Sequence, residues 1–165
     1  MNEMYKEILV KRKTPFVLKL VKPAAIVLIA LLVVLGLAVP LIWIAAAAAA
    51  AAAYFLLPRI NVEYEYLYVN GDIDIDAIYS KQKRKRVASY TMEELEILAP
   101  ENSHALDSYR QKKLTVRDFT SGDEQNKVFV LIENLEKGQE YVRLELTEAI
   151  LKDMRRMAPR KIVLM

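Results

Sequence analysis

The residues of this chain that could do chemistry lie mostly between positions 72 and 107. The densest charge is a basic segment that places five cations within six residues: Lys81, Lys83, Arg84, Lys85 and Arg86. Near an anionic bilayer surface, each cation of such a segment gains about 1 kcal/mol. The segment is therefore a candidate contact for anionic lipid headgroups or for a protein partner.

The same basic segment also has a structural interpretation. Carboxylates that it could meet across a neighbouring strand are Glu65, Asp72, Asp74 and Asp76. Opposite charges on adjacent strands ordinarily stabilise a sheet. The pattern favours this charge ladder, but both interpretations stay open.

Three aspartates, Asp72, Asp74 and Asp76, resemble the start of a calcium-binding loop. Such a loop needs glycine at its sixth position and a bidentate glutamate at its twelfth, where this chain has Ala77 and Lys83. We therefore expect no metal here and interpret the aspartates as one face of a strand.

Other groups of polar residues likewise lack part of a catalytic or metal-binding site. Ser103, His104 and Asp107 contain the residue types of a hydrolase triad, but residues so close along a chain rarely reach triad geometry, and no serine lies in a G-x-S-x-G turn. Glu93, Glu94 and Glu96 have no histidine nearby for a metal site, and cysteine is absent. We expect no catalytic residue and no cofactor, and thus a protein that is not an enzyme.

From position 24 to position 57 the chain has no charged side chain. As one helix this run would be roughly 51 Å long, against a hydrocarbon core of about 30 Å. Gly36 and Pro40 interrupt it near its middle. The run predicts a transmembrane helical hairpin, two short spans joined by a turn around residues 36–40.

The second predicted span contains an unbroken alanine stretch, residues 45–53. Small side chains let another helix approach closely, so Ala45, Ala49 and Ala52 are a candidate helix-packing face. The neighbour is either the first span or a larger membrane protein. The sequence favours the first span.

Positive charge is concentrated ahead of the apolar run. Residues 1–58 carry a net charge of +4 and residues 59–165 a net charge of −1. A near-neutral soluble part argues against nucleic acid as a partner. Because lysine and arginine mark the cytoplasmic side, we expect an integral, multi-pass protein of the cell membrane with both termini in the cytoplasm.

After the apolar run, side chains alternate in two segments, residues 60–69 and 72–79, which Asn70-Gly71 separates. This dipeptide suits a two-residue type I′ turn, so the pattern predicts a β-hairpin. In its register Tyr66 lies opposite Ile75 and Glu65 opposite Asp76. The tyrosines and isoleucines then share the buried face, and the carboxylates share the other.

Further strands are predicted at residues 84–90, 93–99, 113–119, 127–133 and 140–146, with turns at 121–123 and Lys137-Gly138. Residues 92–98 could form a short helix instead. Thr147 begins a C-terminal amphipathic helix that Pro159 ends. About seven antiparallel strands followed by one helix look like the pleckstrin-homology-like (PH-like) barrel, and the fold class is that of an α+β membrane protein.

The chain as a whole resembles an uncharacterised family of small bacterial two-span membrane proteins that carry a C-terminal PH-like domain, a domain of unknown function. The likeness rests on the stretches EILVKRKTP, NVEYEYLYVNGDIDIDAIYSKQKRKR and APRK, and on the apolar run. It supports three parts: a basic cytoplasmic arm (1–22), a transmembrane helical hairpin (23–58) and a cytoplasmic PH-like β domain with a C-terminal helix (59–165). It implies no activity and no catalytic residues.

These features predict a non-enzymatic, membrane-anchored interaction module. It would hold a PH-like domain at the cytoplasmic membrane face to bind an unidentified protein partner or anionic lipid headgroups. The alternative is a small accessory subunit of a transporter or envelope complex, docking through its alanine-rich transmembrane helix.

Overall fold

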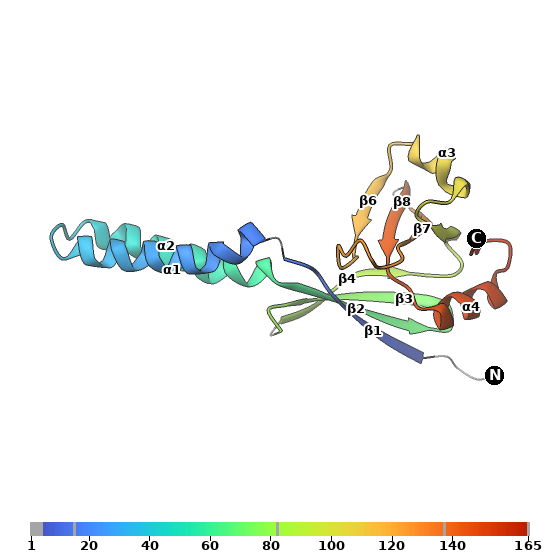
Figure 1. The fold of residues 1–165 in the computed structure, drawn as a ribbon, viewed down its shortest axis with the longest axis horizontal. Coiled ribbons are helices and arrows are strands. Elements are labelled where there is room, and N and C mark those ends of the chain that lie inside the picture. The colour runs from blue at the N-terminus through green and yellow to red at the C-terminus, as the bar shows by residue number, and fades with distance from the viewer. Residues whose placement is uncertain (1–4, 15, 82, 137, 165) are drawn as a thin grey trace.

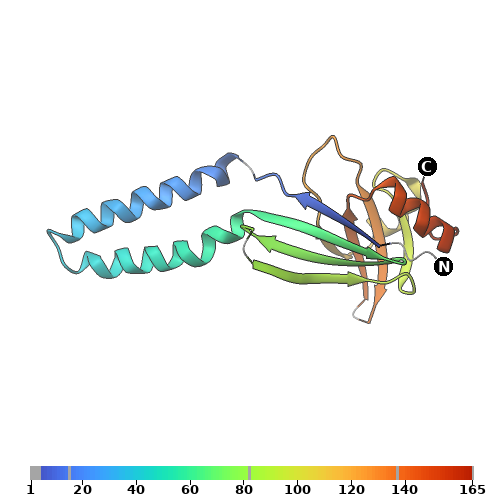
Figure 2. The same ribbon diagram turned by 90° about the horizontal axis from the view of Figure 1, so that it is seen from below.

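The computed structural model describes residues 5–14, 16–81, 83–136 and 138–164, and shows two helices extending from one end of a β domain (Figure 1). Helix α1 (Phe16–Gly36) and helix α2 (Ile42–Leu56) lie side by side in both views (Figure 2). Residues 37–41 connect them at the far end, and a short 3-10 turn, Leu57–Ile60, leads back to the domain.

The first strand of the domain, β1 (Tyr5–Lys11), lies in the segment predicted to be a basic arm. It pairs antiparallel with β2 (Val62–Val69), which follows the helices. Val10 of β1 is buried in the core and Ile8 is half-buried, because every second side chain of a strand points to the same face. The helices are therefore an insertion between the first two strands, and the linear division into arm, hairpin and domain is wrong at this point.

Helix α1 also begins earlier than the apolar run suggests. It starts at Phe16, so Pro23 lies inside the helix and not at its start. Lysine is a good helix former, and Lys19 and Lys22 end the uncharged run without ending the helix. Charge marked the boundary of the apolar segment, which differs from the boundary of the helix.

The predicted hairpin is confirmed. Strand β2 pairs with β3 (Asp72–Tyr79) in the expected register, with Tyr66 opposite Ile75 and Glu65 opposite Asp76. The turn residues have φ of 49° and 104° at positions 70 and 71, the positive values that a type I′ turn requires. Strand β4 (Lys83–Tyr90) completes a sheet in the order β1-β2-β3-β4.

The second sheet has the order β5-β7-β8-β6, from β5 (Leu95–Pro100), β7 (Phe129–Leu135), β8 (Gly138–Leu144) and β6 (Thr115–Asp118). Strand β6 runs parallel to β8, so the expected all-antiparallel arrangement is wrong. The loop over residues 119–128 connects β6 to β7, and these two strands lie on opposite sides of β8 in the sheet. Among the described residues there are eight strands in two sheets and no closed barrel. Lys137 of the predicted turn lies outside the described residues.

The alternative of a short helix at residues 92–98 is wrong. Residues 92–94 form a turn, and β5 starts at Leu95. The predicted C-terminal helix is confirmed as α4 (Glu148–Met157). Thr147 precedes its first turn, and the helix ends two residues before Pro159.

The main core lies between the two sheets and α4. Tyr66 and Ile75 of the first sheet, Val142 of the second and Ile150 of α4 are each fully buried in it. The Tyr68 hydroxyl donates to Asp153 Oδ2 at 2.7 Å and so joins the first sheet to α4.

The outer face of the second sheet is also covered. A 3-10 turn (His104–Leu106) and α3 (Asp107–Arg110) lie over it, and Leu106 packs with Val130 and Ile132. Both apolar faces of this sheet are therefore buried, whereas the helices α1 and α2 contribute nothing to either cluster.

Candidate functional site

Strand β4 divides the predicted basic segment between its two faces. Lys85 lies opposite the buried Ala77, so it points to the same side as the core, beyond the part that the second sheet covers. Arg84 and Arg86 alternate with it and point to the outer face. For Lys83 and Lys85, no ion pair is found among the described residues.

The outer face carries a charge ladder. Arg84 Nε donates to Asp76 Oδ2 at 2.7 Å, and Arg84 also pairs with Glu65. Arg86 lies 2.9 Å from Asp74 and 3.4 Å from Asp76. The hydrogen bond to Asp76 raises the pKa of the Arg84 guanidinium above its ordinary value. These two arginines therefore already have carboxylate partners, as the structural interpretation of the segment predicts.

The third aspartate of β3 stands outside the ladder. Met92 N donates to Asp72 Oδ1 at 3.2 Å, across the end of the hairpin. Each aspartate of β3 thus has a protein partner. Within the described ranges, no group of three or more His, Asp and Glu side chains is arranged to hold a metal ion.

Ser103, His104 and Asp107 lie on the exposed turn that covers the second sheet. His104 Nδ1 is 3.1 Å from Asp107 Oδ2, but Ser103 Oγ accepts from Ala105 N and caps the turn. The His104 side chain is fully exposed. The structure therefore brings the histidine and aspartate together as neighbours on one turn and leaves the serine in a capping role.

The predicted glutamates separate into two environments. Glu93 and Glu94 are exposed. Glu96 accepts hydrogen bonds from Tyr109, Asn134 and Gln139, and these bonds, the one from Tyr109 foremost, lower the pKa of its carboxyl. This network ties α3 to the second sheet.

A buried carboxylate, Glu133, was missed by the sequence analysis. It is fully buried on β7, where its Oε1 accepts from Thr91 N at 2.7 Å, and Oε2 has no hydrogen-bond partner in the described part of the chain. Burial, with a smaller effect from Glu94 and Glu140, raises the pKa of Glu133 to about 7. The sequence gives one indication of this burial: Glu133 is a single acidic residue that directly follows the apolar residues 129–132 of a predicted strand.

The helices meet along a narrow row of side chains. On α2 the least exposed positions are Ile42, Ala46, Ala49 and Ala53. Of the predicted packing face only Ala49 belongs to this row, whereas Ala45 and Ala52 are exposed. The alanine stretch therefore serves at least in part for packing within the chain, the option the sequence favoured.

Gly36 and Trp43 form the tightest contact near the connecting turn. A Cβ atom at Gly36 would lie 3.1 to 3.2 Å from three atoms of the Trp43 indole. That separation is below an ordinary van der Waals contact. Glycine at this position allows the indole to lie against the end of α1.

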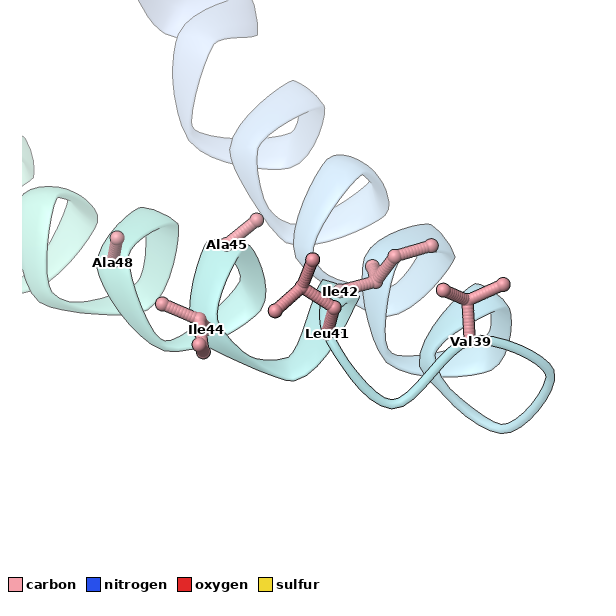
Figure 3. Close-up of a pocket in the computed structure, with 6 residues that line it drawn as sticks. All are labelled: Val39, Leu41, Ile42, Ile44, Ala45 and Ala48. Atoms are coloured by element: carbon pink, nitrogen blue, oxygen red, sulfur yellow. The ribbon is translucent and has the colours of Figure 1, made fainter.

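Helix α2 and the connecting turn carry an open apolar groove of about 460 Å³ (Figure 3). Its lining consists of Val39, Leu41, Ile42, Ile44, Ala45 and Ala48. Ala45 of the predicted packing face thus lines an open apolar surface.

Of the helices in the described residues, α1 alone has both the length and the apolar character to cross a membrane, with a mean hydropathy of 2.5. None of its apolar window is buried within the protein. Helix α2 is equally apolar but has only 15 residues.

Residues 2–164 match the family model described as a bacterial PH-like domain (DUF6106). Comparisons with curated proteins and with solved structures found no match.

Proposed function

We propose that this chain, which belongs to the DUF6106 family of bacterial PH-like domains, is a non-enzymatic interaction module anchored in the cell membrane. Helices α1 and α2 form the transmembrane hairpin. They hold the PH-like domain at the cytoplasmic face, where it binds a protein partner or anionic lipid.

The pairing of β1 with β2 carries this proposal. It runs from Tyr5 opposite Val69 to Lys11 opposite Glu63, and the helices leave and return at the Lys11 end (Figure 2). The start of α1 and the end of α2 are thus tied to one edge of one sheet. If these helices enter a bilayer, they must enter and leave it on the same side.

The surface of the helices supports insertion. Large apolar side chains such as Ile26, Leu31, Ile44 and Phe55 are more than half exposed. Exposed apolar surface costs about 25 cal/mol per Å² in water, and lipid removes that cost. Helix α2 is about 22 Å long, and a short span is accommodated by local thinning of the bilayer.

Cysteine labelling tests the topology, because the chain contains no cysteine of its own. Ala38→Cys reports on the connecting turn, and Gln125→Cys reports on an exposed loop of the domain. With a membrane-impermeant maleimide, position 38 is expected to react in intact spheroplasts and position 125 only in inverted vesicles. Reaction of both positions from the same side would overturn the proposal.

A second candidate function is that of an accessory subunit docked through α2. The open groove and the exposed Ala45 favour it. It predicts that Ala45→Leu with Ala48→Leu abolishes co-purification of a crosslinked membrane partner. The matched control is Ala47→Leu with Ala51→Leu, which adds the same volume at two other exposed alanines.

A further inference from the structure

A cavity of about 420 Å³ lies at the junction of the helices and the first sheet. Four cationic side chains line it, Lys11, Arg12, Lys22 and Lys81, with Glu63 as its one carboxylate. We call these residues and the space between them the junction cavity. Its lining has a net charge of +3.

Three separate parts of the fold supply the four cations. Lys11 ends β1 and Arg12 follows it, Lys22 lies on α1, and Lys81 lies in the turn between β3 and β4. Lys81 has φ of 60°, a left-handed conformation that costs a residue other than glycine about 1 kcal/mol or more. The fold therefore accepts strain at a position that adds a cation to the cavity.

The rim of the junction cavity is tied together at Asn61. Thr14 Oγ1 donates to Asn61 Oδ1 at 3.3 Å, and Ser80 N donates to Asn61 O at 2.8 Å. Arg12 N donates to Val62 O at 3.3 Å. These bonds connect the segment before α1, the segment after α2 and the β3–β4 turn, so the cations are held near one another.

The four cations of the junction cavity differ from nearby basic residues in that the nearby ones form ion pairs with carboxylates. Lys13 pairs with Asp123 at 2.8 Å, and Arg84 and Arg86 pair with the carboxylates of the ladder. In the described part of the chain, none of the four cations of the junction cavity takes part in an ion pair, although Arg12 Nη1 donates to the Tyr64 hydroxyl at 3.2 Å. Four cations that share a single carboxylate, Glu63, leave an excess of positive charge that favours an anionic ligand.

The position of the cavity identifies the chemistry of the anion. Lys22 is the last charged residue before the uncharged run of α1, so in an inserted hairpin the cavity lies at the level of the lipid headgroups. Arginine and lysine are the side chains that bind phosphate. Resting on the proposed membrane anchoring, we infer that the junction cavity binds a phosphate group, that of an anionic phospholipid.

The test uses the full chain in detergent, titrated with phosphatidylglycerol and with phosphatidylcholine and followed by native mass spectrometry. The cavity variant is Lys22→Gln with Lys81→Asn, where asparagine tolerates the left-handed backbone. The matched control is Lys113→Gln with Lys127→Gln, which removes the same charge from two exposed positions of the domain outside the basic segment. Phosphatidylglycerol is expected to bind more tightly, and the cavity variant is expected to lose about tenfold or more in affinity, against less than twofold for the control.

Two results would overturn the inference: equal losses in both double variants, which indicate attraction to surface charge in general, or undiminished binding by the cavity variant. Lys22→Arg with Lys81→Arg is expected to keep the affinity, which excludes a folding defect as the cause of a loss. Displacement of phosphatidylglycerol by inorganic phosphate or glycerol phosphate at millimolar concentration would assign the cavity to soluble phosphates and contradict the lipid as its source.

Failure of the inference is distinguishable from failure of the proposed function. Carbonate extraction of native membranes reports on anchoring without reference to lipid headgroups. A chain that stays in extracted membranes yet shows no preference for phosphatidylglycerol contradicts only the junction cavity. A chain that carbonate releases contradicts the anchor.

Discussion

Lys11 lies directly opposite Glu63 at the end of the β1–β2 ladder, and the whole helical segment is inserted between these two residues. The six paired positions behind them belong to one sheet of the domain. The strand before the helices and the strand after them are thus held side by side by a ladder of backbone hydrogen bonds. The orientation of the helices and that of the first sheet are linked.

The contribution of β1 to the domain can be measured through its buried side. Val10→Ala removes a side chain from the main core and is expected to lower the free energy of unfolding by about 2 kcal/mol. Leu9→Ala, on the exposed face of the same strand, is expected to change it by less than about 0.5 kcal/mol. The free energies of unfolding of the two variants are compared by urea unfolding in detergent, followed by near-UV circular dichroism. Equal effects would mean that β1 is not docked on the domain.

The contact between Gly36 and Trp43 predicts a spectroscopic effect of substitution. Gly36→Leu requires the indole to move away, since even a Cβ atom comes within 3.1 Å of it. Trp43 is the only tryptophan, so its fluorescence maximum reports the change directly, and we expect a shift. Ala30→Leu, at an exposed position of the same helix, is expected to leave the spectrum as it is.

Glu133 predicts that stability falls as pH rises. Its pKa is raised to about 7 in the folded protein, whereas an unfolded glutamate titrates near 4.3. Between these values the folded state binds more protons at this site than the unfolded state, so the contribution of Glu133 to stability is fully present below about pH 4.3 and falls, by roughly 3 kcal/mol, up to about pH 7.

Glu133→Gln is expected to remove this part of the pH dependence and to stabilise the protein at pH 7.5. Unfolding midpoints measured at several pH values test it. Glu93→Gln, an exposed neighbour, serves as the control and is expected to keep the wild-type profile. A profile of Glu133→Gln that matches the wild type would show that Glu133 stays ionised.

The two faces of β4 are expected to respond differently to charge removal. Arg84→Gln takes a partner from Asp76 and Glu65 and is expected to lower the urea midpoint. Lys85→Gln, on the other face, is expected to leave it unchanged. The difference should shrink in 1 M salt, because screening weakens exposed pairs. A larger effect of Lys85→Gln would contradict the ladder as a source of stability.

Several features of the domain were predictable because they depend on neighbours along the chain. The β2–β3 hairpin follows from the alternation of side chains and from Asn70-Gly71, all within twenty residues. The charge ladder follows from the same register, once β4 lies beside β3. Helix α4 likewise shows its boundaries through Thr147 and Pro159.

The features that escaped prediction depend on residues far apart. Strand β1 resembled a charged arm because its partner, β2, comes only after both helices. The parallel pairing of β6 and β8 depends on the course of a loop that has no repeating pattern. In the sequence Glu133 looks like an ordinary surface acid. Its burial, which excludes water and raises its pKa, arises only when the domain is folded.

Local periodicity, turn chemistry and charge along the chain predict the apolar helices, the hairpin register and the C-terminal helix. The folded chain adds two features that no local pattern contains: the helices interrupt the domain, and one cavity is lined by Lys11, Arg12, Lys22 and Lys81. Both depend on the pairing of strands that lie far apart in the sequence, because this pairing sets which charges become neighbours.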